Sequence, residues 1–324
     1  MTTADGTGGR GPADFETVLP GAPQMVASFE EERPSALRRA QNFLHGYPTT
    51  IPFLVLLIGV VLFSSIVGNK FLAPFNLSLV LQQVTIVATL GVAQTLVILT
   101  AGIDLSVGAI MILTSVVMGR TCVVYGVPLE IAFPLGFLVG FACGAVNGLI
   151  ITYLRLPPFI VTLGTWSIFG ALNIYYSRSE TIRQQDVEAA APFLQWTGTI
   201  IKPYDALNSV GLDLPFLKGS VLTYGSLLML VLAAGVWYLL NRTPFGRHVY
   251  ATGDDPDSAR LAGISTNRTL IAVYALAGVI CAVAAWVLIG RIGGISPQGG
   301  QDANLDSITA VVIGGTSLFG GRGS

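Results

Sequence analysis

Long apolar runs, separated by shorter polar stretches, dominate this chain from residue 51 onward. Most approach or exceed the roughly 20 residues that a helix needs to cross a bilayer, although the third and eighth runs are short and rich in glycine. We place eight spans, at residues 51–67, 77–99, 105–119, 129–154, 159–176, 221–240, 269–289 and 305–319. The pattern predicts an all-α polytopic membrane protein whose membrane domain covers residues 48–324.

The composition agrees with a membrane protein. Hydrophobic residues make up 52% of the chain and charged residues 11%, whereas a soluble domain carries roughly 25% charged residues. The net charge of −1 offers no electrostatic basis for binding nucleic acid, so we expect no nucleic-acid partner. Cys122, Cys143 and Cys281 lie in or beside apolar runs without metal-ligand spacing, and we interpret them as packing residues.

Three polar stretches interrupt the apolar pattern. Residues 1–47 are rich in Gly, Pro and Glu, which predicts a disordered cytoplasmic tail with a short amphipathic piece at 34–44. Residues 177–219 are mixed in charge and interrupted by proline. Residues 241–268 form a polar, helix-capable segment between two spans, so they are soluble structure held against one membrane face.

The orientation follows from the basic residues near the spans, because cytoplasmic loops carry an excess of Lys and Arg. A cytoplasmic N-terminus puts more of these residues inside than outside, and we therefore favour it. Residues 241–268 are then cytoplasmic and residues 177–219 periplasmic. The inside set is Arg33, Arg38, Arg39, Arg155, Arg242, Arg247, Arg260, Arg268 and Arg322, and the outside set is Lys70, Arg120, Arg178, Arg183, Lys202, Lys218 and Arg291.

A shift of 202 residues suggests an internal repeat. It lays residues 104–115 over residues 306–317, with Asp, Thr and Ser coinciding and apolar or small residues between them. The third and eighth spans would cross in opposite directions, as in an inverted repeat with five spans in each half. Such a protein needs ten spans, so we expect two more beyond Ser324. Chance similarity between apolar spans is the alternative.

A few polar residues lie within or between the spans. Asp104 has glycines on either side, and ionisable groups at membrane depth are costly and often functional. We interpret it either as a helix break near a substrate path or as the cap of a helix that starts at the cytoplasmic interface. Asp306 invites the same two interpretations at the opposite face. Neutral amides such as Gln94, Asn147 and Asn304 suit an uncharged, hydroxylated solute, and hydrogen bonding between helices explains each equally well.

The chain shows no machinery for hydrolysing a nucleotide. Gly315 and Gly320 have the spacing of a phosphate-binding loop, but Gly321 and Arg322 stand where that motif requires Lys and Ser or Thr. His45 and His248 lie in separate polar regions and share no motif. We therefore expect no catalytic residue, cofactor or metal, and any energy for transport must come from outside this chain.

Within residues 241–268 the local signals predict a helix of about two turns. Asp255 can cap it, Pro256 suits its first position and Gly263 supplies a left-handed end. Such a helix is too short to be stable alone in water, so it must pack against its own spans or another protein. An amphipathic connector and a docking element are both compatible with these signals.

Four motifs resemble the permease subunits of bacterial ABC-type monosaccharide importers of the ribose, xylose and fructose kind. They are LTAGIDLSVGAIM, LPPFIVTLGT, NRTPFGRHVYATGDDPDSARLAGI and ANLDSITAVVIGGTSLFGGRGS. They occur in the family's order between residue 82 and the end of the chain. The paired acids of ATGDDP are closer to fructose-import permeases than to ribose-import permeases.

The resemblance implies a multi-pass translocation subunit in the bacterial inner membrane. A second permease copy would complete the sugar path, a periplasmic sugar-binding protein would deliver the sugar, and cytoplasmic ATP-binding subunits would supply the energy. It further implies that a coupling loop fits a groove on the ATPase, with Gly246, Arg247, Asp255, Ala259, Arg260 and Gly263 belonging to that loop. Two other functions stay open: a secondary transporter or channel for a small neutral solute, and an ABC permease for branched-chain amino acids.

Overall fold

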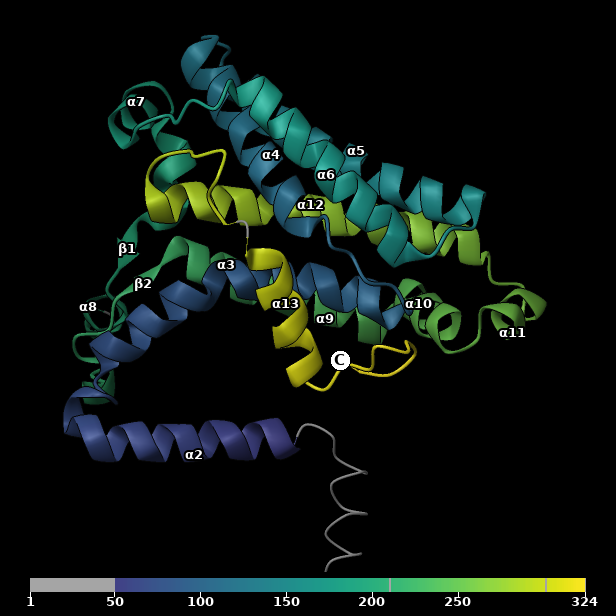
Figure 1. The fold of residues 1–324 in the computed structure, drawn as a ribbon. Coiled ribbons are helices and arrows are strands. Elements are labelled where there is room, and N and C mark those ends of the chain that lie inside the picture. Colours follow the sequence, from purple (N-terminus) through teal and green to yellow (C-terminus); the bar gives the residue numbers. More distant parts are fainter. Residues whose placement is uncertain (1–49, 210, 301, 324) are drawn as a thin grey trace, which may run out of the picture. The chain divides into compact units, whose positions relative to one another are not determined.

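The computed structural model describes residues 50–209, 211–300 and 302–323. The tail expected at residues 1–47, with its amphipathic piece, lies outside these residues. The membrane helices are α2 (Thr50–Val67), α3 (Pro74–Leu99), α4 (Val107–Gly119), α5 (Leu129–Leu154), α6 (Pro158–Ser177), α9 (Tyr224–Arg242), α12 (Thr266–Ile292) and α13 (Ala303–Ile313). Figure 1 shows their arrangement.

Shorter elements connect these helices. The single-turn 3₁₀ helix η1 follows α2, and the π-helical segment η2 continues α4. The remaining elements are η1 (Gly68–Lys70), η2 (Arg120–Val124), α7 (Gln184–Ala190), η3 (Pro192–Gly198), β1 (Ile200–Ile201), α8 (Pro203–Asn208), η4 (Pro215–Leu217), β2 (Leu222–Thr223), α10 (Pro244–Asp254) and α11 (Pro256–Leu261).

The predicted membrane architecture is confirmed. Within the described residues, six helices are long and apolar enough to cross a bilayer, and α2 and α13 contribute two shorter apolar helices. One span is longer than predicted, because the helix that we ended at residue 119 continues through η2 to Val124. Its extra turn carries Arg120, whose guanidinium is buried and donates hydrogen bonds to the Ser177 carbonyl (2.6 Å) and to Glu180 (2.9 Å). Pairing with these groups lets a charged side chain extend the span.

The eighth predicted span is wrong at its C-terminal end. We placed it at residues 305–319, but α13 ends at Ile313. Gly314 follows, and Gly315 adopts a positive φ of 98° that a helix cannot contain. Residues 316–323 form turns and loops instead.

Helix α12 is the centre of the packing, against α5, α3 and α4. Its contact with α5 is unusually close, because a Cβ atom on Gly278 would lie 2.1 Å from the Gly140 carbonyl oxygen. Small residues allow helices to approach this closely in a membrane, where dispersion contacts replace the hydrophobic effect between helices. Tyr274 of α12 is fully buried in the same core.

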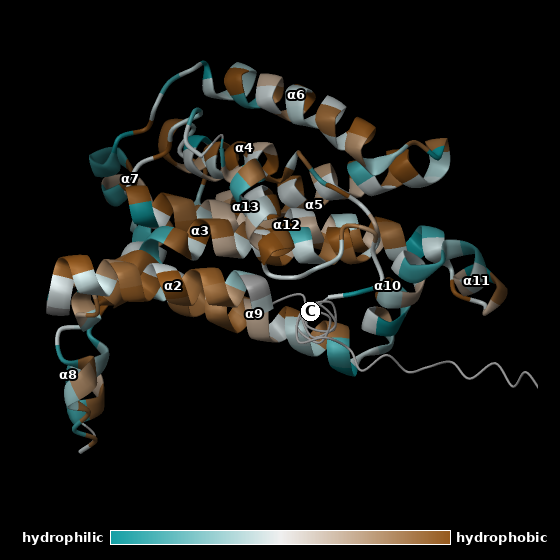
Figure 2. Ribbon diagram, turned by 60° about the horizontal axis from the view of Figure 1, so that its bottom comes forward, coloured by the Kyte–Doolittle hydropathy of each residue, from teal (hydrophilic) through white to brown (hydrophobic). Residues whose placement is uncertain are grey.

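The polar elements lie at the two ends of the helices. In Figures 1 and 2, α7 and α8 lie at one end and α10 and α11 at the other, while the long helices between them are predominantly hydrophobic. At the first end, strands β1 and β2 pair antiparallel, with Ile200 opposite Thr223. The elements of the two polar stretches seen in the sequence therefore lie at opposite ends of the long helices.

Candidate functional site

A break between α3 and α4 contains Asp104. Helix α3 ends at Leu99, and Ala101 has a positive φ of 59°, which turns the chain before α4 begins at Val107. The Asp104 carboxylate is only 1% exposed. Its Oδ1 atom accepts hydrogen bonds from the Ser106 amide (2.7 Å) and the Ser106 hydroxyl (2.6 Å). This side chain therefore satisfies the backbone where the helix is interrupted.

Other buried amides join this break to its neighbours. Gln94 of α3 donates a hydrogen bond to the Asp104 carbonyl (2.7 Å), and Asn147 of α5 donates one to the Ser106 hydroxyl (2.8 Å). Asn304 at the start of α13 accepts a hydrogen bond from the Gly108 amide. These bonds link α3, α4, α5 and α13 through one polar cluster, which we call the break cluster: Gln94, Asp104, Ser106, Asn147 and Asn304.

The break cluster includes four of the five residues that the sequence singled out for a substrate path or helix break. The fifth, Asp306, is exposed in the first turn of α13 and contacts none of them through a hydrogen bond among the described residues. Asp104 lies in a break and Asp306 within a helix, so the two acids occupy different local structures. The internal repeat stays a prediction.

A cavity of about 430 Å³ lies between α4, α6 and the turn before α13. Asn173 of α6 is buried there and donates a hydrogen bond to the Pro297 carbonyl (2.8 Å). Its Oδ1 atom has no hydrogen-bond partner among the described residues. The lining combines an indole, two amides and a hydroxyl with small and apolar residues: Ala109, Ile112, Trp166, Ser167, Gly170, Ala171, Asn173, Ile174, Pro297 and Gln298.

This cavity was missed by sequence reasoning. Asn173 is, like Gln94 and Asn147, a neutral amide within a predicted span, but Trp166 and Gln298 carry no signal in the sequence. The three lining segments are far apart in the sequence, and the cavity forms where the turn at Pro297 and Gln298 meets α4 and α6.

The polar segment of residues 241–268 folds as two helices rather than one. Thr243 caps α10, its hydroxyl accepting a hydrogen bond from the Gly246 amide, and Asp255 caps α11 by accepting from the amides of Asp257 (2.9 Å) and Ser258 (3.2 Å). The two-turn helix predicted after Asp255 is α11. Hydrogen bonds from the Ser258 side chain and amide, and from the Asp257 amide, lower the pKa of the Asp255 carboxyl.

The residues of the predicted coupling loop differ in their surroundings. Gly246 and Ala259 are buried, and a Cβ atom at residue 246 would lie 1.9 Å from the Leu240 carbonyl. Gly263 ends α11 with a positive φ of 86°. Arg247 is exposed, whereas Arg260 donates hydrogen bonds to Thr266 (2.9 Å) and to Asp257 (3.2 Å). The segment thus has a fixed inner side and a charged outer side.

Helix α10 is fitted against the break by backbone contacts. A Cβ atom on Gly253 would lie 1.8 Å from the Leu99 carbonyl oxygen, so only glycine allows this approach. The same carbonyl accepts a hydrogen bond from the Gly321 amide (3.0 Å), and Tyr250 donates one to the Gly323 carbonyl (2.8 Å). The glycine-rich segment that lacks the residues of a phosphate-binding loop therefore joins α10 to the end of α3.

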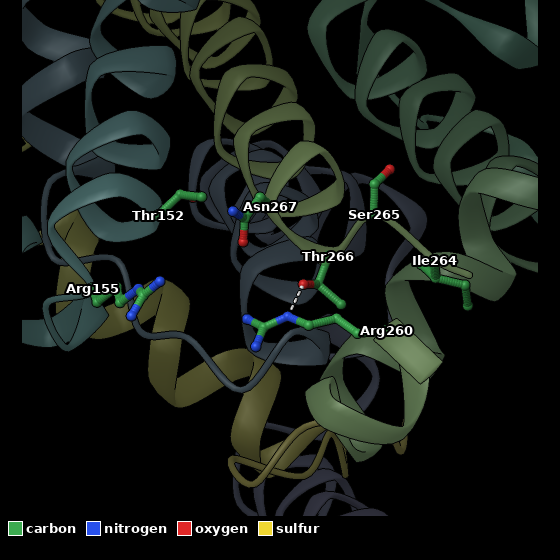
Figure 3. A pocket seen from close by; sticks show the side chains of 7 residues that line it. All are labelled: Thr152, Arg155, Arg260, Ile264, Ser265, Thr266 and Asn267. Atoms are coloured by element: carbon green, nitrogen blue, oxygen red, sulfur yellow. Dashed lines mark hydrogen bonds between the residues drawn. The ribbon is translucent and has the colours of Figure 1, made fainter. Parts of the chain in front are cut away.

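A second cavity, of about 410 Å³, lies where α5 ends and α11 and α12 meet. Figure 3 shows the guanidinium groups of Arg155 and Arg260 approaching it from opposite sides, with Asn267 between them. Arg155 follows the last residue of α5, and Arg260 belongs to α11. The lining is mostly polar: Thr152, Arg155, Arg260, Ile264, Ser265, Thr266 and Asn267.

Polytopic helices, a partly polar cavity between them and a structured segment at one membrane face together define a transport permease. Residues 76–321 match the family described as "Branched-chain amino acid transport system / permease component", and the chain belongs to this family. It is therefore a transport component rather than an enzyme.

Several curated proteins are similar over most of the chain. A fructose import permease protein, FrcC, of Rhizobium meliloti is 50% identical over 311 residues, which cover 96% of this chain and 82% of the relative. A ribose import permease protein, RbsC, of Bacillus subtilis is 36% identical, covering 84% and 78%. The xylose transport system permease protein XylH of Escherichia coli is 33% identical, covering 79% and 75%. No solved structure gives a significant match.

Proposed function

We propose that this chain is the translocation subunit of an ATP-driven importer for a monosaccharide, with a fructose-like sugar as its cargo. The observation that carries the proposal is the 50% identity, over 96% of the chain, to a fructose import permease. Ribose and xylose permeases are similar too, although the family description names branched-chain amino acids. Because these similar proteins are sugar permeases, we favour a sugar over an amino acid as the cargo of this chain.

The cavity beside α6 supports a neutral, hydroxylated cargo. Trp166 offers an aromatic face, while Ser167, Asn173 and Gln298 offer hydroxyl and amide groups. Ligand pockets typically span about 300–1,000 Å³ and combine apolar walls with a few polar groups, and this one has about 430 Å³. None of its lining residues is charged, so an uncharged solute suits it better than a zwitterionic amino acid.

The energy enters, in this proposal, at α10 and α11. These helices face the cytoplasm if the N-terminus does, and cytoplasmic ATP-binding subunits would bind there through the exposed side of the coupling loop. A permease that hydrolyses no ATP is driven only if two states of its partner favour two different permease conformations. Because α10 contacts the backbone of Leu99, a movement of α10 would displace the end of α3 and so reach the α3–α4 break.

The opposite face would receive a periplasmic sugar-binding protein. The surface of this chain that contacts the binding protein would lie within residues 177–219, where α7, η3 and α8 form structured elements. A second permease copy would complete the translocation path in the inner membrane.

Reconstitution of the full-length protein tests the proposal. We expect fructose to accumulate in proteoliposomes only when ATP, the ATP-binding subunits and the binding protein are all present. Accumulation driven by an ion gradient without any ATPase would show a secondary transporter instead. A sugar and amino-acid panel titrated into the binding protein identifies the cargo, and selective binding of leucine or valine would replace the sugar by an amino acid.

A further inference from the structure

The cavity between α5, α11 and α12 has the charge of an anion site. Arg155 and Arg260 line it, and none of its seven lining residues is acidic. Arg260 is held in place by Thr266 and Asp257. Within the described residues, Arg155 makes no side-chain hydrogen bond or ion pair, so its five donors stay free for a ligand.

The backbone at Arg155 has an uncommon conformation. Arg155 caps the end of α5 in the left-handed conformation, with φ 54° and ψ 36°. Glycine or asparagine usually occupies such a position, because other side chains are strained there. An arginine here places a guanidinium at the cavity mouth at a cost in backbone energy. Arg178 has nearly the same conformation at the end of α6, so this conformation places the side chain but does not by itself mark a binding site.

Helix α12 directs its N-terminus at the same cavity. Ser265 occupies the capping position but makes no side-chain capping hydrogen bond, and Thr266 and Asn267 begin the helix. The first amides of a helix carry a partial positive charge and bind anions, phosphate above all. Two guanidinium groups and a helix N-terminus therefore converge on one space.

Apolar side chains beside the cavity indicate where the ligand comes from. Tyr153 and Leu154 are 72% and 64% exposed, and Leu156 is also exposed on the other side of Arg155. They lie at or just beyond the end of a helix long and apolar enough to span the bilayer, where the acyl chains of a lipid can reach them. We propose that this cavity binds the phosphate group of an anionic glycerophospholipid, whose acyl chains lie along Tyr153 and Leu154.

Such a lipid would connect three elements of the permease. Its phosphate bridges the end of α5, the start of α12 and, through Arg260, helix α11. Basic pockets between transmembrane helices bind anionic headgroups in this way. A bound lipid restrains α11 against the spans, so the lipid composition would set how firmly that segment is held. The inference requires only that the chain lies in a membrane, and it does not depend on the cargo.

Two matched substitutions test the site. Arg155→Gly removes one guanidinium at a position that favours glycine, so we expect the fold to be kept. Arg178→Gly is the control. Arg178 follows the last residue of α6 in nearly the same left-handed conformation, φ 54° and ψ 27°, whereas Arg155 lies before the first residue of α6. Native mass spectrometry of the full-length protein in detergent counts the phosphatidylglycerol and phosphatidylcholine that it retains, and thermal unfolding checks each variant.

We expect the native protein to retain phosphatidylglycerol in preference to phosphatidylcholine. Arg155→Gly should weaken phosphatidylglycerol binding by about tenfold, as expected for the loss of a charge-assisted, bidentate contact, whereas Arg178→Gly should leave it unchanged. Equal retention of phosphatidylglycerol by Arg155→Gly and the native protein would overturn the proposal. Displacement of the lipid by millimolar inorganic phosphate would show a free-phosphate site, and displacement by purified ATP-binding subunit would show an acidic protein surface; either overturns it too.

Discussion

Asp104 and Asp255 perform the same local task in opposite environments. Each accepts hydrogen bonds from residues two or three positions further along the chain, and each precedes the start of a helix. Asp104 is almost completely buried and belongs to a cluster that joins four helices, whereas Asp255 is exposed and shapes only α11. Asp104 therefore holds the turn before α4 and contributes to the cohesion of the spans, whereas Asp255 is a true N-cap that shapes an exposed helix.

The two regions are also in contact with each other. Gly253 at the end of α10 lies directly against the carbonyl group of Leu99, and Leu99 is the last residue of α3 before the break. The exposed region can therefore transmit a displacement to the buried one without any side chain between them. We therefore propose that the break cluster stabilises the spans and that α10 and α11 carry the coupling to the ATP-binding subunits.

The largest effect should come from Asp104→Ala. The substitution leaves the Ser106 amide and hydroxyl without their buried acceptor, and each unsatisfied buried group costs roughly 1–3 kcal/mol. We expect a loss of about 3 kcal/mol in the free energy of unfolding, measured by chemical denaturation in detergent. Asp306→Ala is the matched control, because that side chain is exposed. Equal losses in both variants would remove the distinction between the two acids.

A smaller effect is expected from Gly253→Ala. The new Cβ atom would overlap the Leu99 carbonyl, so α10 must move away from the end of α3. Overpacking of this kind costs roughly 1–3 kcal/mol, and we expect transport per ATP hydrolysed to fall more than the melting temperature. Gly235→Ala on α9 is the control, since its Cβ atom meets nothing within 4 Å. Normal coupling in Gly253→Ala would mean that force does not pass through this contact.

The smallest effect is a pH dependence confined to α11. The pKa of Asp255 is lowered in the folded protein, so its stabilising contribution is present above its unfolded pKa of about 3.9 and is lost as the pH falls through the folded pKa. Amide protection in α11, measured by hydrogen exchange, should therefore decrease at acidic pH. Asp255→Asn keeps a good cap that does not titrate, so its pH profile should be flat. An acid-induced loss of protection in that variant would assign the effect to another group.

The fold was predictable from the sequence to the extent that hydropathy determines it. A bilayer requires long apolar helices with satisfied backbones, so the spans followed from run length. The end of α13 was predicted wrongly, because the glycine turns after Ile313 are as apolar as a span. The extension of the third span to Val124 was also missed, because the partner of Arg120 lies in a distant segment.

The candidate sites were predictable only in part, for a related reason. The cap at Asp255 is a local pattern of adjacent residues, so the sequence predicted α11. The grouping of Asn304 with the residues around Asp104 depends on the packing of α13 against α4, which no local pattern reveals. The cavities beside α6 and at Arg155 likewise join distant segments, and hydropathy says nothing about which side chains face each other across them.

The most direct test of the central claim is sugar uptake by Arg247→Glu, with its thermal stability measured on the same preparation. Arg247 is exposed on α10 and lies outside both cavities. Reversing its charge should weaken the contact with the ATP-binding subunits while leaving the spans intact. We predict an unchanged melting temperature and a fall in ATP-dependent uptake of roughly tenfold, equivalent to about 1.4 kcal/mol of lost interaction. Normal uptake with an unchanged melting temperature would contradict the assignment of coupling to this region.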